Sequence, residues 1–142
     1  MKVDFAFICD YADARGKINA LGIGFDTIYA LKVPVKHPVF SFVLQLRASL
    51  EDAGTKKIEV HLIDEDGKDI IPAINKNIQI RRPTTGTEIV TRVALQFGNV
   101  KFPRHGHYSI HAVLDDSEIA CVPLNVSLPP KQLPGAQPLS IN

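Results

Sequence analysis

The chain has 142 residues, of which 45% are hydrophobic and 22% are charged, the proportions of one globular domain. Its 16 Lys and Arg against 15 Asp and Glu give a net charge of +1, which does not favour a nucleic-acid-binding protein with a broad basic face. No apolar run approaches the roughly 18–20 residues that cross a bilayer, and the apolar stretch between Asp4 and Asp10 is too short for a secretory signal. These features predict a cytoplasmic protein with no membrane span.

Most of the sequence alternates with a period of two, which predicts strands rather than helices. The expected strands, in chain order, are 2–11, 17–31, 39–50, 57–64, 70–80, 87–98, 107–115 and 118–128. In the strand 39–50, inward side chains are expected to alternate with outward, solvent-facing ones. The inward set is Phe40, Phe42, Leu44 and Leu46, and the outward set is Ser41, Val43, Gln45 and Arg47.

Glycine, proline and aspartate separate these strands. Gly22 and Gly24 predict a bulge or sharp bend within 17–31, and Asp66-Gly67 predicts a hairpin turn. The segment 70–80 is the least regular, which is typical of an edge strand or partial loop. We therefore predict one domain over residues 1–128, followed by a Pro-rich C-terminal tail, 129–142, that is extended or flexible.

Eight short strands joined by turns indicate a sandwich or a barrel. Gly106-His107-Tyr108 opens a late strand in the manner of a tyrosine corner, in which the tyrosine hydroxyl bonds backbone a few residues upstream. The fold class predicted is all-β, an immunoglobulin-like antiparallel β-sandwich of about eight strands with little or no helix. The chain has no Trp, and its two cysteines are not spaced as an inter-sheet disulfide, so an antibody-type domain is not expected.

The opening third of the chain carries a distinctive order of short motifs. They are Cys9-Asp10-Tyr11-Ala12, Gly16-Lys17-Ile18-Asn19 and Gly22-Ile23-Gly24-Phe25-Asp26, followed by Pro34, Pro38 and the 39–50 strand. This order resembles an uncharacterised family of short bacterial β-sandwich proteins, over about residues 5–125. The resemblance implies a bacterial source and a stand-alone sandwich, and it implies no activity.

Two groups of polar residues are candidate binding sites. Asp10, Tyr11, Asp13 and Asp26 lie in expected loops, which often carry function on a rigid sandwich. Arg47 and Arg92, on outward strand positions, are candidates for an anion-binding patch. The structural alternatives are local backbone capping by the aspartates and ordinary solvent-facing charge for the arginines.

The sequence offers ligands for two kinds of metal site, each with a structural role as the alternative. His105 and His107 lie on one face about 7 Å apart, and a zinc ion there needs a third ligand such as His61 from a neighbouring strand. Calcium needs carboxylates pooled from Asp10, Asp13, Asp26 and the 64–69 turn. Neither spacing demands a metal, and no cofactor is expected.

Nucleophilic catalysis has little support in the sequence. A Gly-x-Ser-x-Gly elbow, a phosphate-binding loop and a dinucleotide motif are all absent from the sequence. Cys9 falls on the face of Phe5 and Phe7 and is expected in the core, whereas Cys121 alternates with apolar residues and no base can be assigned to it.

The function predicted is a non-catalytic protein-binding or assembly module. Its partner is expected to be another protein or a second copy, bound through a sheet edge or face. The alternatives are a small metal-dependent enzyme built on the histidine cluster and calcium-dependent binding through the acidic loops.

Overall fold

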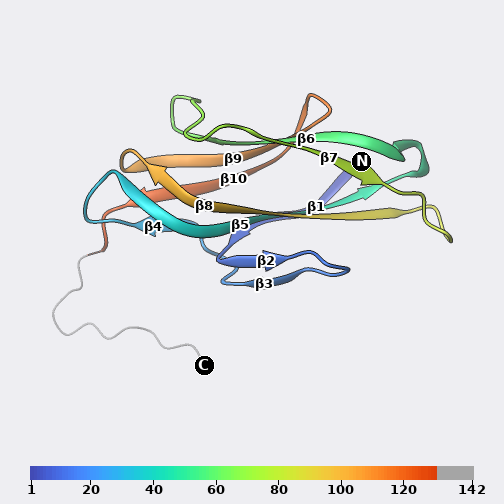
Figure 1. Ribbon diagram of the computed structural model, residues 1–142, viewed down its shortest axis with the longest axis horizontal. Coiled ribbons are helices and arrows are strands. Elements are labelled where there is room, and N and C mark those ends of the chain that lie inside the picture. The colour runs from blue at the N-terminus through green and yellow to red at the C-terminus, as the bar shows by residue number, and fades with distance from the viewer. Residues whose placement is uncertain (131–142) are drawn as a thin grey trace.

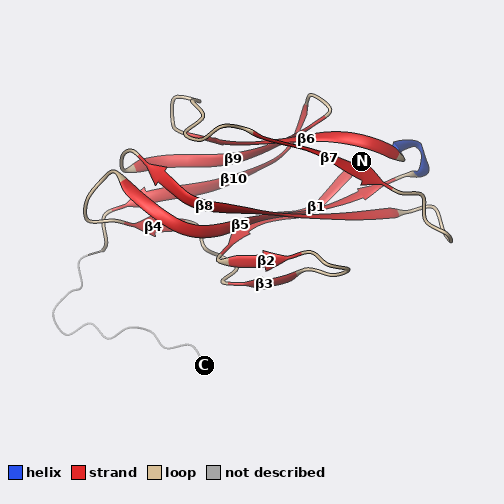
Figure 2. Cartoon of the chain, in the orientation of Figure 1, coloured by secondary structure: helices blue, strands red, loops and turns tan. Residues whose placement is uncertain are grey.

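The computed structural model describes residues 1–130. They contain ten strands and one short 3-10 turn, joined by loops (Figure 2). The strands are β1 (Lys2–Cys9), β2 (Tyr11–Asp13), β3 (Asn19–Leu21), β4 (Thr27–Tyr29), β5 (Val35–Ala48), β6 (Gly54–Ile63), β7 (Ile74–Ile80), β8 (Ile89–Phe102), β9 (Gly106–Leu114) and β10 (Ser117–Ser127). The 3-10 turn, Leu50–Asp52, joins β5 to β6. Most of the predicted tail, from residue 131 on, lies outside the described residues.

Two sheets face each other across the main core (Figure 1). One has the order β1-β5-β8, and the other has the order β4-β10-β9-β6-β7. Alternate side chains of the first sheet meet those of the second in a single buried cluster, whose fully buried members include Phe40, Phe42, Leu44, Leu46, Leu62, Ile110 and Leu124. The predicted all-β sandwich is therefore confirmed, while its immunoglobulin-like topology stays a prediction.

The expected strand 17–31 is wrong, because the chain turns twice within it. Gly22 and Gly24 have φ values of +71° and +95°, which divide the segment into β3 and β4. β3 pairs with β2 in a separate hairpin, and β4 pairs with β10 in parallel, so the sandwich is not purely antiparallel. The irregular segment 70–80 becomes a strand only from Ile74. Residues 1–130 therefore hold ten strands rather than about eight.

The β2–β3 hairpin forms a third layer against the outer face of the β1-β5-β8 sheet (Figure 1). The alternation of β5 is as predicted, but its outward side is not open to solvent as expected. Ser41, Val43 and Gln45 are 1%, 0% and 8% exposed. Cys9, which pairs with Ser41, is fully buried as expected, but it lies on this outer side of the sheet and not in the main core between the two sheets.

The tyrosine corner is present as predicted. The buried Tyr108 donates its hydroxyl proton to the carbonyl oxygen of Arg104 at 2.6 Å, and its ring packs edge-on against Phe102 with centroids 5.1 Å apart. This bond fixes the turn between β8 and β9. The same turn forms one wall of the groove described next.

Candidate functional site

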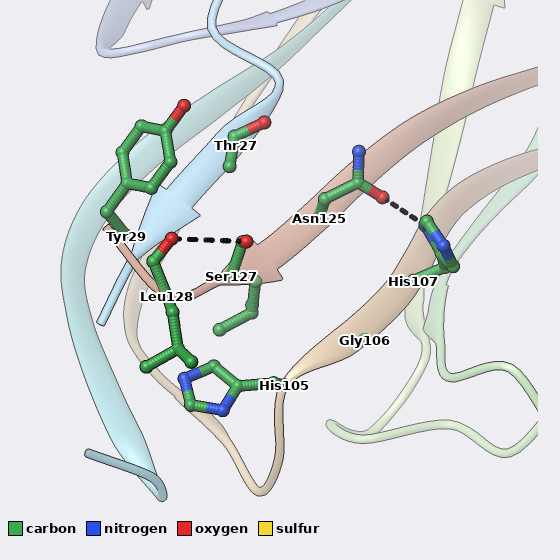
Figure 3. A pocket seen from close by; sticks show the side chains of 9 residues that line it. Thr27, Tyr29, His105, Gly106, His107, Asn125, Ser127 and Leu128 are labelled. Carbon is green, nitrogen blue, oxygen red and sulfur yellow. Dashed lines mark hydrogen bonds between the residues drawn. The ribbon is translucent and has the colours of Figure 1, made fainter. Parts of the chain in front are cut away.

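An open groove of about 560 Å³ lies where β4, β10 and the start of β9 meet (Figure 3). Thr27 of β4, Asn125 of β10 and His107 of β9 are neighbours in the strand register and form one row across its floor. Tyr29 and Ser127 form a second row, and Leu128 extends beside the ring of His105 (Figure 3). The strand residues of both rows have their side chains on the sheet face that points away from the core.

Protein oxygens set the hydrogen positions of the two groove histidines. Nε2 of His105 lies 2.7 Å from the carbonyl oxygen of Ala30, and Nδ1 of His107 lies 2.6 Å from Oδ1 of Asn125. Because both oxygens accept, each of these nitrogens carries the proton, and the second ring nitrogen of each histidine is an acceptor. The hydroxyls of Thr27 and Ser127 donate to Asp26 and to the Leu128 carbonyl, so neither is bonded to a groove histidine.

The acidic turn after β6 braces the wall of the groove. Glu65 accepts the backbone N–H of His107 at 2.8 Å, and Arg104 bonds both Asp64 and Asp66. Asp64 also accepts the backbone N–H groups of Lys68 and Asp66, and the bond from Lys68 is the largest reason why its pKa is lowered. This turn was a candidate calcium donor, and its carboxylates instead cap backbone and bind Arg104.

The backbone of β4 has a free side. The carbonyl oxygen of Asp26 accepts from Asn125, and the N–H of Ala30 donates to Ser127, so the even-numbered residues bond β10. Successive residues of a strand turn their backbone groups to opposite sides. The N–H and C=O groups of Thr27 and Tyr29 therefore face away from β10, and β10 is the one strand that pairs with β4 within residues 1–130.

The predicted binding aspartates do not converge. Asp10 and Asp13 lie on the hairpin, where Asp10 packs against Gly22 and Asp13 accepts the backbone N–H of Arg15 at 2.9 Å. Asp26 immediately precedes β4 and accepts the hydroxyl of Thr27. Tyr11 is exposed on the hairpin, opposite the still more exposed Leu21 in the strand register.

The predicted anion patch is a hydrogen-bonded network between the sheet and the hairpin. Asp4 Oδ2 accepts from Arg47 Nε at 2.6 Å and from Gln45 Nε2 at 2.8 Å. Gln45 in turn accepts from Arg92 at 2.9 Å, and Arg92 reaches the carbonyl oxygen of Gly16. The bond from Gln45 is the first cause of the lowered pKa of Asp4. Arg47 also pairs with Glu88, so both arginines already have protein acceptors.

The structure does not bring His61 to His105 and His107. In the register of β6 and β9, His61 lies opposite His111, four residues along β9 from His107, or about 13 Å. Its two ring nitrogens contact Asp69 and Glu59. Within residues 1–130, no group of three or more His, Cys, Asp or Glu is arranged to hold a metal ion, which leaves the zinc and calcium hypotheses without a site.

Both cysteines are free thiols, and their surroundings differ. Cys9 is fully buried, and burial raises its pKa. Cys121 is exposed, with Nε2 of His111 3.7 Å from its sulfur. Sequence reasoning assigned no base to Cys121, and it also missed Tyr29, Asn125 and Leu128 in the groove. The sequence indicates only weakly that these residues line one groove, because that inference requires knowing that β4 pairs with β10.

Comparison with known proteins places the chain in a family. No curated protein matches it. Within the described residues, no helix has the length and apolar character needed to cross a membrane. The profile of a family of unknown function, DUF6941, matches residues 4–127, which span nearly all the described strands. The chain therefore belongs to this family of unknown function.

Proposed function

We propose that this protein is a non-catalytic binding module that takes an extended segment of a partner protein along the free edge of β4. An uncharged, apolar side chain of that segment lies in the groove. The observation that carries the proposal is the position of Tyr29, whose backbone belongs to the free edge and whose side chain lines the groove.

An unpaired edge favours an extended segment as the occupant. Backbone groups of Thr27 and Tyr29 that face away from β10 can pair with an added strand, which supplies affinity without regard to sequence. Edge strands that do not bind are commonly protected by charged side chains. β7, the opposite edge of the same sheet, carries Lys76, whereas β4 carries the exposed Tyr29. The two edges therefore differ in the way expected if β4 is the one that pairs.

The lining of the groove favours an uncharged side chain. Among the described residues that line it, none is Asp, Glu, Lys or Arg. Tyr29 and Leu128, both 58% exposed, supply apolar surface, and the second ring nitrogens of His105 and His107 supply hydrogen-bond acceptors. The hydroxyls and histidines of the groove bond protein groups rather than one another, which supports binding rather than catalysis.

A selection of short random peptides displayed on phage, followed by amide NMR of the full chain, tests this proposal. Selected peptides are expected to be apolar and to shift the amides of residues 27–31 and 127–128. Tyr29→Lys puts a charge on the edge and should weaken binding at least about tenfold, a loss of about 1.4 kcal/mol. Asn77→Lys places the same charge on β7 and should leave binding unchanged.

Three results would overturn the proposal. One is a selection that yields no binder, and a second is a set of peptides that bind Tyr29→Lys as tightly as the parent chain. The third is a peptide-induced shift confined to the hairpin around Tyr11 and Leu21. If light scattering shows that the parent chain is a dimer and that Tyr29→Lys dissociates it, the occupant of the β4 edge is a second copy of this chain and not a segment of another protein. We also propose a bacterial source, which the family resemblance implies, and a cytoplasmic location, which the sequence favours.

A further inference from the structure

The outer face of the five-stranded sheet carries a second cluster of reactive side chains, away from the groove. His61, His111 and Cys121 lie side by side on the adjacent strands β6, β9 and β10, because the register pairs His61 with His111 and His111 with Cys121. Ser109 and Glu118 complete the cluster around His111.

A β-bulge places Glu118 and Cys121 on the same face. Residues three apart on a regular strand point to opposite faces. The register of β10 shifts between Glu118 and Ala120, so that Glu118 lies opposite Val113 and Cys121 lies opposite His111, two positions on one face of β9. Without this bulge, the thiol and the carboxylate could not both reach one imidazole.

The contacts of His111 fix which nitrogen is free to accept a proton. The carboxylate of Glu118 bonds Nδ1, and since a carboxylate accepts, Nδ1 carries the ring proton. Nε2 then presents its lone pair to the hydroxyl of Ser109 at 2.8 Å and to the sulfur of Cys121 at 3.7 Å. A nucleophile beside a base that a third group orients is the arrangement that activates thiols.

His61 does not compete for the same proton. From β6, the titratable side chain of His61 also faces His111. Its ring nitrogens contact Asp69 and Glu59 and not the thiol of Cys121. Ser109 does compete, because its hydroxyl is the closer of the two groups at Nε2. A thiol is intrinsically the stronger nucleophile, so we assign the reactive role to sulfur.

We propose that Cys121 is a reactive surface thiol, activated by His111, that forms mixed disulfides with small disulfide molecules. His111 Nε2 takes the thiol proton as the sulfur attacks one sulfur of the small disulfide. The Cys121–sulfur bond forms, the disulfide bond breaks, and the departing thiolate takes the proton back from the imidazolium. The small disulfide is the oxidant, and one molecule of small thiol leaves for each chain modified.

The test uses the native full chain and oxidised glutathione at pH 7, with mass spectrometry to locate and time the adduct. One glutathione is expected on Cys121, at least about tenfold faster than on the same thiol in urea-unfolded chain. Cys121→Ser should abolish the adduct. Cys9→Ser, which removes the buried thiol, should leave the rate unchanged.

Three further variants distinguish activation from mere exposure. His111→Gln should slow the reaction at pH 7 by about tenfold, and Glu118→Gln should slow it in the same direction. Ser109→Ala should speed it, because the competing hydroxyl is gone. Above about pH 9.5, where an ordinary thiol ionises unaided, His111→Gln and the parent chain should react at the same rate. That convergence shows that the thiol of the variant remains accessible, and a circular dichroism spectrum equal to that of the parent chain shows that the variant is folded.

The proposal is overturned if His111→Gln matches the parent chain at pH 7, or if native Cys121 reacts no faster than the unfolded thiol. It is overturned equally if the His111→Gln deficit persists unchanged at high pH, because the loss then reflects altered structure. These outcomes are independent of peptide binding at β4, which concerns different residues.

Discussion

The Nη1 atom of Arg92 donates a hydrogen bond to the carbonyl oxygen of Gly16 at 3.0 Å, across 76 residues of chain. Gly16 lies in the loop of the β2–β3 hairpin, and Arg92 lies on β8 beneath it. The same guanidinium bonds Gln45, which bonds Asp4 of β1. One side chain therefore connects the hairpin to all three strands of the sheet that it covers.

Replacing Arg92 by Gln is expected to loosen the hairpin without unfolding the sandwich. Amides in residues 10–21 should exchange with deuterium faster than in the parent chain, whereas those of β5 and β9 should keep their slow exchange. Lys101→Gln removes an exposed cation from the same strand and should leave hairpin exchange unchanged. Hairpin exchange that is equal in Arg92→Gln and Lys101→Gln would show that the network does not hold this layer.

The strands of the sandwich were predictable because their pattern is local. Each buries one face against the opposing sheet, so the alternation of Phe40, Phe42 and Leu44 is visible without knowing their partners. The same holds for Tyr108, whose hydrogen-bond acceptor is only four residues away. The strand boundaries at Gly22 and Gly24 were harder to predict. A bend at a glycine with positive φ does not show whether the strand continues beyond it.

The sites were less predictable because they depend on long-range pairing. The solvent-facing appearance of Ser41 and Val43 was misleading, since a hairpin elsewhere in the sequence covers them. The groove exists because β4 pairs with β10 from the other end of the chain. His111 and Cys121 meet across two strands, and Glu118 joins them through a bulge that period-two alternation cannot reveal.

Gly22→Ala should destabilise the hairpin more than Gly16→Ala. Both glycines have a left-handed φ, +71° and +76°, so each substitution costs about 1–2 kcal/mol in backbone strain. A Cβ on Gly22 would also lie 2.1 Å from Oδ2 of Asp10, whereas one on Gly16 meets nothing within 4 Å. Hydrogen exchange of residues 10–21 should rank the variants in that order. Asp10→Ala should relieve part of the Gly22→Ala defect, and equal effects at the two glycines would contradict the steric argument.

Tyr108→Phe should destabilise the whole sandwich by about 1–2 kcal/mol, because it removes the hydroxyl of a buried side chain and leaves the carbonyl oxygen of Arg104 without this partner. The chain has no Trp, so urea unfolding is best followed by circular dichroism. Tyr29→Phe removes the same atom from an exposed ring and should change stability by less than about 0.5 kcal/mol. A Tyr108→Phe midpoint equal to that of Tyr29→Phe would mean that the corner bond contributes nothing.

His61 should stabilise the fold more in mild acid than in mild base. The hydrogen bond that His61 Nδ1 donates to the carboxylate of Asp69 is the main reason that the pKa of His61 is raised, against the opposing effect of burial. Stability from a raised pKa is fully present below the unfolded value, about 6.5, and is lost as pH rises through the folded value. The stability difference between the parent chain and His61→Gln should therefore be larger at pH 5.5 than at pH 8.5, by urea midpoint. An unchanged difference would show that Asp69 does not favour the charged ring.

His37 should respond to pH with the opposite sign. Burial lowers its pKa, and its ring stacks on Phe25 with centroids 5.6 Å apart and lies 5.8 Å from Phe40. Stability from a lowered histidine pKa is fully present above the unfolded value, about 6.5, and is lost as pH falls below it, because the folded state resists the proton. His37→Phe keeps an aromatic ring and removes the titration. It should therefore lose less stability than the parent chain between pH 8.5 and pH 5.5, whereas His61→Gln should lose more. If both variants shift the pH dependence in the same direction, the contrast between burial at His37 and carboxylate hydrogen bonding at His61 is not what sets these two pKa values.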